Sequence, residues 1–175
     1  MKELKELVFN ENNIQLNGNL VKGSILPEKM AELGRNITVQ ADSVIEGAVY
    51  SYKLEIQNGK TEFHGPVFTQ LELFVNSDAL GDIIFHKCVG SANSVVSRAT
   101  KCNLSFYSDI NAKKVTLFNA FVAGSIYADE VTLQNCVVIG GVFSTQSAVI
   151  SYSFVGTCYG PSVSVGVLLI VRVPG

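Results

Sequence analysis

Few residues of the types that carry catalysis or bind metals occur in this chain of 175 residues. The two histidines, His64 and His86, fall at different positions of the sequence repeat described below. A zinc site needs at least three protein ligands, so we expect isolated surface histidines and no metal site. The cysteines form no CxxC pair, which favours reduced thiols packed in the interior over a zinc or redox motif. They are Cys88, Cys102, Cys136 and Cys158.

The pairs of neighbouring carboxylates in the chain give little further indication of a catalytic or metal site. Asp129 and Glu130 are adjacent and point apart, whereas Glu55 and Glu72 are expected to share one outward column of the repeat. Such a pair could hold a cation or raise one pKa, although a solvated acidic face is the simpler interpretation. The chain has no GxSxG motif, no Cys–His pair and no phosphate-binding glycine loop. We therefore expect no catalytic residue, no cofactor and no enzymatic activity, and an enzyme is the least favoured hypothesis.

A sequence motif of small and apolar residues, without catalytic or metal-binding side chains, recurs along the chain instead. Gly124, Gly140 and Gly156 are spaced by 16 residues, and the motif can be followed back through Ser108 to Gly23. Apolar residues stand two places before and two places after these anchors. The column before them is Val21, Ile45, Phe63, Ala79, Phe106, Val122, Val138 and Phe154. The column after them is Ile25, Val49, Val67, Ile83, Val95, Ile110, Ile126, Val142 and Cys158.

Each period therefore holds three short strands with alternating inward and outward side chains. One coil cannot bury its own face, so only a stack of coils is stable. The sequence predicts an all-β fold, a parallel β-helix of about eight to nine coils of 16–18 residues, over residues 36–175. Residues 1–35 are expected to form an N-terminal cap with the first partial coil, and residues 1–9 and 26–34 of it to be short helical segments.

Two other all-β folds fit less well. A β-sandwich needs hairpin turns, and QNGK at 57–60 is the only good candidate for one. A left-handed β-helix built from hexapeptides has 18 residues in each coil, which a spacing of 16 does not match. Glycine at the anchors suits a β-helix, because a tight corner often needs a positive φ.

The phrases GAVYSYKLEI, SDINAKKVTL and GSIYADEVTL share the pattern G-x-[IV]-x-[AS]-x-x-[VL]-x-[IL], with Ser for the Gly in the second. The pattern resembles the repeats of the bactofilins, the polymer-forming cytoskeletal proteins of bacteria, over residues 36–165. This resemblance implies a right-handed, triangular β-helix that associates end to end into non-polar filaments, with no nucleotide and no enzymatic activity. The chain departs from the family in having more aromatic and fewer charged residues, and a segment at 27–35 that interrupts the first coils.

A stripe of large residues is expected on the outer surface, three places after the anchors. Its members are Leu26, Tyr50, Phe68, Ile84, Val96, Tyr127, Phe143 and Tyr159. We call its aromatic members, Tyr50, Phe68, Tyr127, Phe143 and Tyr159, the aromatic strip. The strip either stabilises neighbouring coils as a ladder or docks a partner.

Charge is distributed unevenly along the chain. From residue 131 to the end, Arg172 is the only charged residue. The final coil lacks the charged or polar cap that usually blunts a terminal strand, which indicates self-association through this end. The residues expected at that contact are Val165, Val167, Leu169 and Val171.

The leading hypothesis is a non-enzymatic scaffold that self-associates end to end into a bactofilin-like cytoskeletal polymer. The alternative is a discrete oligomeric binding module that presents the aromatic strip to a protein or glycan ligand. The formal net charge of −2 gives no reason to expect nucleic acid as a partner. With no secretory signal and no apolar run long enough to cross a bilayer, we expect a cytoplasmic protein with weak or no membrane contact.

Overall fold

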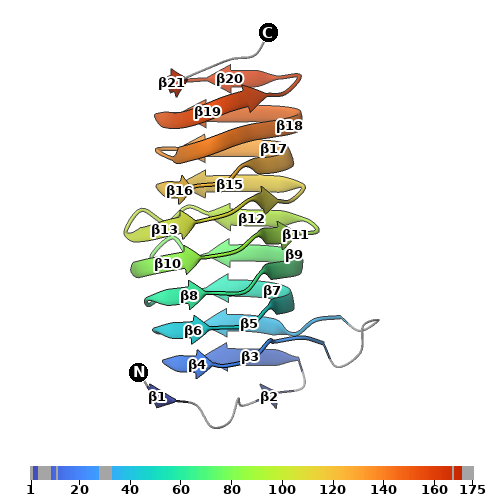
Figure 1. Ribbon diagram of the computed structural model, residues 1–175, viewed down its shortest axis with the longest axis vertical. Helices are drawn as coiled ribbons and strands as arrows, with labels where there is room; N and C mark the ends of the chain where they lie inside the picture. Colours follow the sequence, from blue (N-terminus) through green and yellow to red (C-terminus); the bar gives the residue numbers. More distant parts are fainter. Residues whose placement is uncertain (1, 4–8, 11, 28–32, 167, 171–175) are drawn as a thin grey trace.

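The computed structural model describes residues 2–3, 9–10, 12–27, 33–166 and 168–170. Over these ranges the chain forms strands and turns and no helix, which confirms the predicted all-β class. From residue 36 to residue 165 the strands stack in parallel as a solenoid of about seven turns, and further strands precede it (Figure 1). In the same ranges, no helix has the length and apolar character needed to span a membrane.

Strands of successive turns pair in register and form three ladders. The first ladder contains β3 (Asn13–Leu16), β5 (Asn36–Val39), β12 (Ser94–Ser97), β15 (Lys114–Phe118) and β20 (Val163–Val165). The second contains β1 (Lys2–Glu3), β4 (Asn19–Val21), β6 (Ser43–Ile45), β8 (Thr61–Phe63), β10 (Gly81–Phe85), β13 (Cys102–Phe106), β16 (Ala120–Val122) and β21 (Leu168–Ile170). The third contains β11 (Val89–Ser91) and β14 (Ile110–Asn111).

Five longer strands turn a corner and so belong to more than one ladder. They are β7 (Val49–Ile56), β9 (Val67–Val75), β17 (Ile126–Gln134), β18 (Val137–Ser151) and β19 (Ser153–Tyr159). Among the described strands, one pair is antiparallel, and it joins β2 (Phe9–Asn10) to β3. The helical segment expected at 1–9 lies partly outside the described residues, and its described residues are in β1 and β2. Most of the segment expected at 26–34 also lies outside them.

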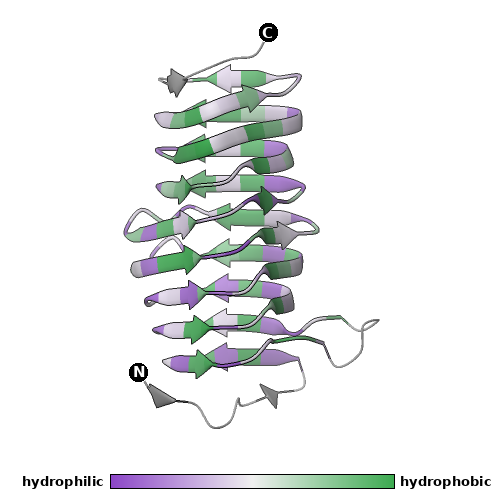
Figure 2. Cartoon of the chain, in the orientation of Figure 1, coloured by the Kyte–Doolittle hydropathy of each residue, from purple (hydrophilic) through white to green (hydrophobic). Residues whose placement is uncertain are grey.

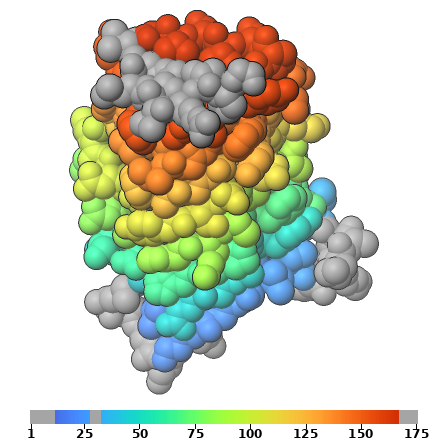
Figure 3. All heavy atoms as spheres, turned by 45° about the horizontal axis from the view of Figure 1, so that its top comes forward, coloured from blue at the N-terminus to red at the C-terminus, as the bar shows by residue number. Residues whose placement is uncertain are grey.

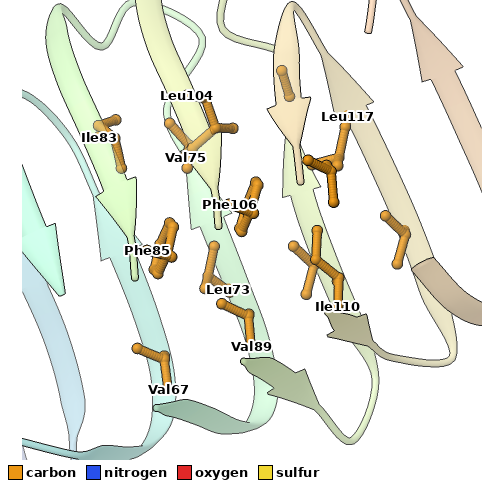
Figure 4. Close-up of a cluster of buried hydrophobic side chains, with 14 of the residues drawn as sticks. Val67, Leu73, Val75, Ile83, Phe85, Val89, Leu104, Phe106, Ile110 and Leu117 are labelled. Atoms are coloured by element: carbon orange, nitrogen blue, oxygen red, sulfur yellow. The ribbon is translucent and has the colours of Figure 1, made fainter. Parts of the chain in front are cut away.

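The interior is a stack of aligned, buried columns that are mainly apolar, as the repeat predicted. Ile126 pairs with Val142 on the next turn, and both side chains are fully buried. A neighbouring column contains Phe63, Phe85 and Phe106, whose rings stack at 4.8 Å spacing within 4° of parallel. Figure 4 shows Phe85 and Phe106 among the buried side chains. β-Branched and aromatic side chains pack well on such a pleated surface, which explains why they fill these positions.

The predicted spacing is wrong in the middle of the chain. Thr69 and Ser91, which pair on successive turns, are 22 residues apart, and Asp82 and Asn103 are 21 apart. Extra residues at 76–80 and 98–101 lengthen the corner between the first and second ladders in these turns. Two long turns therefore replace three short ones, which explains the smaller number of turns.

The longer turns also change the columns. Val89 stands where Ile83 and Val95 were expected, and Phe85 stands where Ala79 was expected. Near the end of the chain, Val155 is the inward residue in place of Phe154, because that turn is 17 residues long.

At the repeat anchors Gly47 and Gly65, glycine is required for close packing rather than for a positive φ, whereas the anchor Gly81 has the expected positive φ, at 91°. A Cβ atom on Gly65 would lie 2.3 Å from the carbonyl oxygen of Gly47 on the preceding turn. Neither residue has a positive φ. These two corners therefore approach so closely that a side chain would collide with backbone, and the expectation based on φ is wrong for Gly47 and Gly65.

Candidate functional site

The C-terminal end of the stack carries an open sheet edge. β20 pairs with β18 along one side, and β21 pairs with β19 along one side. Within the described part of the chain, no strand covers the other side of either one. An uncovered edge presents unpaired backbone N–H and C=O groups that can pair with another chain.

Two of the three side chains of β20 are apolar and exposed. Val163 and Val165 of β20 are 41% and 43% exposed. Of the other residues predicted at the contact, Val167 and Val171 lie outside the described residues. Leu169 lies in β21, and the structure does not describe its side chain. Figure 3 brings this end of the molecule forward.

Apolar residues continue onto the sides of the last turns (Figure 2). The exposed large hydrophobic residues there are Val137, Ile139, Val149, Tyr152 and Tyr159. At the opposite end β1 pairs with β4 in parallel and β2 pairs with β3 antiparallel, and each of these two strands also has one side that no described strand covers. The two ends of the stack therefore differ in the direction of one terminal strand pair, which is antiparallel at the N-terminal end and parallel at the C-terminal end.

The predicted aromatic strip lies in one outward column but is interrupted. The ring centroids of Tyr50 and Phe68 are 5.2 Å apart, and those of Tyr127 and Phe143 are 5.1 Å apart. Tyr159 pairs with Phe143 one turn further on. Gly90 and Asn111 occupy the two turns between Phe68 and Tyr127, and Ile84 and Val96, expected in this stripe, belong to other ladders.

The interruption creates a groove. It has a volume of about 490 Å³, and Leu26, Tyr50, Phe68 and Tyr127 are among the residues that line it. Gly90 has no side chain to fill the space between the two aromatic blocks. The strip is thus a ladder at each end with a mainly apolar hollow between.

The prediction that the two histidines occupy different positions is wrong. Phe63 pairs with Phe85, so His64 and His86, which follow them, take equivalent places on successive turns. Their ring centroids lie 4.8 Å apart, with the ring planes at 81°. The signal that could have revealed this is the repeated Phe-His pair at 63–64 and 85–86, which the assumed period of 16 residues concealed.

Glu62 lies on the same outward face, two residues before His64. Its Oε2 atom is 3.3 Å from Nε2 of His64 and 3.6 Å from Nε2 of His86. The hydrogen bond from His64, together with His86 and Lys60, lowers the pKa of Glu62 in spite of partial burial. The Glu62 carboxylate is therefore ionised at neutral pH, and it joins the two imidazoles in one cluster.

The expected stacking of Glu55 on Glu72 is also wrong. Lys53 pairs with Glu72, and an extra residue in β9 shifts the register between Ser51 and Lys53. The Nζ atom of Lys53 lies 3.7 Å from Glu55 and 3.6 Å from Glu72. The lysine separates the two carboxylates, so they form no paired acidic site.

All four cysteines are free, and three of them are buried. Burial raises the pKa of the Cys102, Cys136 and Cys158 thiols. Cys136 also donates from Sγ to the carbonyl oxygen of Leu117 at 3.2 Å. These thiols serve packing, whereas Cys88 is exposed.

Comparison with protein-family models, with curated proteins and with solved structures finds no match to this chain.

Proposed function

We propose that this protein is a non-enzymatic structural scaffold whose β-helices associate end to end into a bactofilin-like cytoplasmic polymer. The observation that carries the proposal is the open C-terminal edge formed by β20 and β21. Its backbone groups match those of another parallel or antiparallel strand, so a second copy extends the sheet across the contact.

The side chains at this end favour the same association. Val163 and Val165 are exposed on the terminal strand, and contact with another copy removes their apolar surface from water. Charged residues at an end would oppose such a contact, and residues 131–171 contain none. An end that is both unpaired and apolar is the arrangement that soluble β proteins usually avoid.

A filament without polarity alternates two contacts, C-terminal end to C-terminal end and N-terminal end to N-terminal end. Each contact relates two copies by a two-fold axis, so the same surface serves both partners. The open edge supports the first contact. At the other end, β1 and β2 are the terminal strands and each is paired on one side only, which supports the second contact.

Negative-stain electron microscopy of the full chain, with sedimentation velocity over a concentration series, tests the proposal. We expect linear assemblies whose length increases with concentration. A chain that stays monomeric at all concentrations contradicts the scaffold proposal.

A second candidate is a discrete oligomer that binds a protein or glycan ligand, and the groove between Phe68 and Tyr127 favours it. A single dimer or trimer at all concentrations would support this candidate. Replacing Tyr50 and Tyr127 with Ser should then abolish ligand binding while the oligomer size stays unchanged. Under the scaffold proposal, the same substitutions leave assembly intact.

A further inference from the structure

We propose that Glu62, His64 and His86 bind a divalent first-row transition-metal ion, with Zn²⁺ as the best match. Among the described residues, these three bring one carboxylate oxygen and two imidazole nitrogens within 4.8 Å of one another. The site lies on the second ladder, away from the C-terminal edge, and does not depend on the scaffold proposal.

The distances fit one small ion. Ligand atoms held tetrahedrally at about 2.0–2.1 Å from zinc lie about 3.3 Å from one another. The observed separations from Oε2 of Glu62 are 3.3 Å to His64 and 3.6 Å to His86. The remaining separation, between a ring nitrogen of each imidazole, is within 4.8 Å. Both imidazoles are partly exposed, so a small rotation of the His64 ring can bring these two nitrogens closer together.

The orientation of the rings also fits. An imidazole binds a metal through a lone pair in its ring plane, so two imidazoles on one ion cannot stack flat. Phe63 and Phe85, one residue earlier, stack within 3° of parallel, whereas His64 and His86 stand at 81°. On the same two turns, the phenylalanine rings stack flat in the interior, whereas the imidazole rings on the outer surface are arranged edge to face.

One ligand atom in the cluster lacks a hydrogen bond. Nε2 of His86 is buried and has no hydrogen-bond partner in the described structure. Its 3.6 Å separation from Glu62 exceeds normal hydrogen-bond length. Buried polar atoms are rarely left unpaired, and a metal ion bound by this nitrogen would satisfy it.

The fold pre-positions the ligands. Parallel pairing of β8 with β10 fixes the two histidine backbones one turn apart, and the stacked phenylalanines beneath hold both strands. Lys60 contacts the other carboxylate oxygen, Oε1, at 3.7 Å and leaves Oε2 to face the imidazoles. Two nitrogens and one oxygen suit zinc and its neighbours, whereas Mg²⁺ and Ca²⁺ prefer oxygen ligands alone.

Calorimetric titration of the full chain with ZnCl₂, without a histidine tag, tests the site. The background carries Cys88→Ser, because that exposed thiol is a competing ligand. We expect one ion per chain, and His64→Gln or His86→Gln should each weaken binding by about tenfold or more, because losing even a group that supports a ligand costs that much. Glu130→Gln, which removes an exposed carboxylate paired with Lys114, should leave binding unchanged.

A second readout protects the test against misfolded variants. The chain contains only two histidines, so their ¹⁵N imidazole signals in the Cys88→Ser protein report the site directly. Both should shift together and saturate at one equivalent of Zn²⁺. Lys60→Met should raise the affinity by about threefold or more, since it removes a neighbouring positive charge. Absence of binding, or binding that leaves both imidazole signals in place, overturns the proposal.

Discussion

The phenyl ring of Phe85 lies 4.8 Å from that of Phe106 on the next turn, within 4° of parallel. Phe63 stacks on its other side at the same spacing. Phe85 is fully buried, so it contacts both neighbouring turns inside the stack. In a solenoid each turn is stabilised chiefly by the turns beside it, and this residue therefore couples three of them.

Phe85→Ala should destabilise the protein by about 3–5 kcal/mol, because it leaves a cavity that the flanking rings cannot fill. Phe68→Ala is the matched control, since Phe68 is 38% exposed on the outer surface. It should cost about 0.5–1.5 kcal/mol, the range for an aromatic pair. Urea denaturation followed by circular dichroism measures both changes. Equal losses for the two variants would show that the inner column does not dominate stability.

Tyr152 is strained at a corner of the stack. Its φ is 50°, and Asn119 and Asn135, at equivalent corners of the preceding turns, have φ values of 52° and 54°. Asn tolerates this left-handed conformation better than Tyr does. Tyr152 is 65% exposed, so replacing it loses little packing.

Tyr152→Asn should therefore stabilise the protein by about 1 kcal/mol, the lower end of the cost of this conformation. The reverse exchange, Asn135→Tyr, should destabilise it, because it also removes the hydrogen bond from Asn135 to Asn119. Thermal and urea unfolding of the two variants check the signs. Stabilisation by Asn135→Tyr would contradict this account of the corner.

The cysteines should differ sharply in reactivity. At pH 8 a thiol-specific reagent should modify one thiol rapidly, and Cys88→Ser should abolish this fast phase, because Cys102, Cys136 and Cys158 are buried. Reaction of the remaining thiols should require unfolding. A fast phase that persists in Cys88→Ser would show that a buried thiol is accessible.

The raised pKa of the buried thiols also predicts alkaline destabilisation. The folded state holds these protons above pH 9.0, the value for an ordinary thiol, whereas the unfolded state loses them. The thiols' contribution to stability is therefore complete below pH 9.0 and declines as the pH rises further. Replacing Cys136 with Ala should reduce the decline, as urea denaturation at pH 8 and pH 10 would measure.

Much of the fold could be predicted because each turn repeats the same inward and outward alternation. Ile126 and Val142 lie in the interior where the sequence placed them, and the regular spacing of 16 residues holds in that part of the chain. The middle could not be predicted in the same way. Corner loops add residues without disturbing the ladders, so a fixed period misplaces Ala79 and Ile84 while the strands themselves stay paired.

The surface features were less predictable than the core. The outward stripe is predicted from one repeat period of 16–18 residues. Where a turn is longer, that period selects residues that belong to other ladders, and it misses Gly90 and Asn111, which lie in the stripe. The cluster of Glu62, His64 and His86 depends on the 22-residue turn that brings His86 over His64. Alternation within one strand predicts whether a side chain points inward or outward. The length of the turn decides which residue of the next turn is stacked on it.

The most direct test of end-to-end association compares two valines of similar exposure. Val165 is 43% exposed on the terminal strand β20, and Val137 is 40% exposed on β18, which is paired there on both sides. In sedimentation velocity, the unmodified chain and Val137→Lys should form assemblies that grow with concentration, whereas Val165→Lys, which keeps only the N-terminal contact, should form nothing larger than a dimer of the 18.9 kDa chain. Assembly of Val165→Lys equal to that of the unmodified chain would contradict the account.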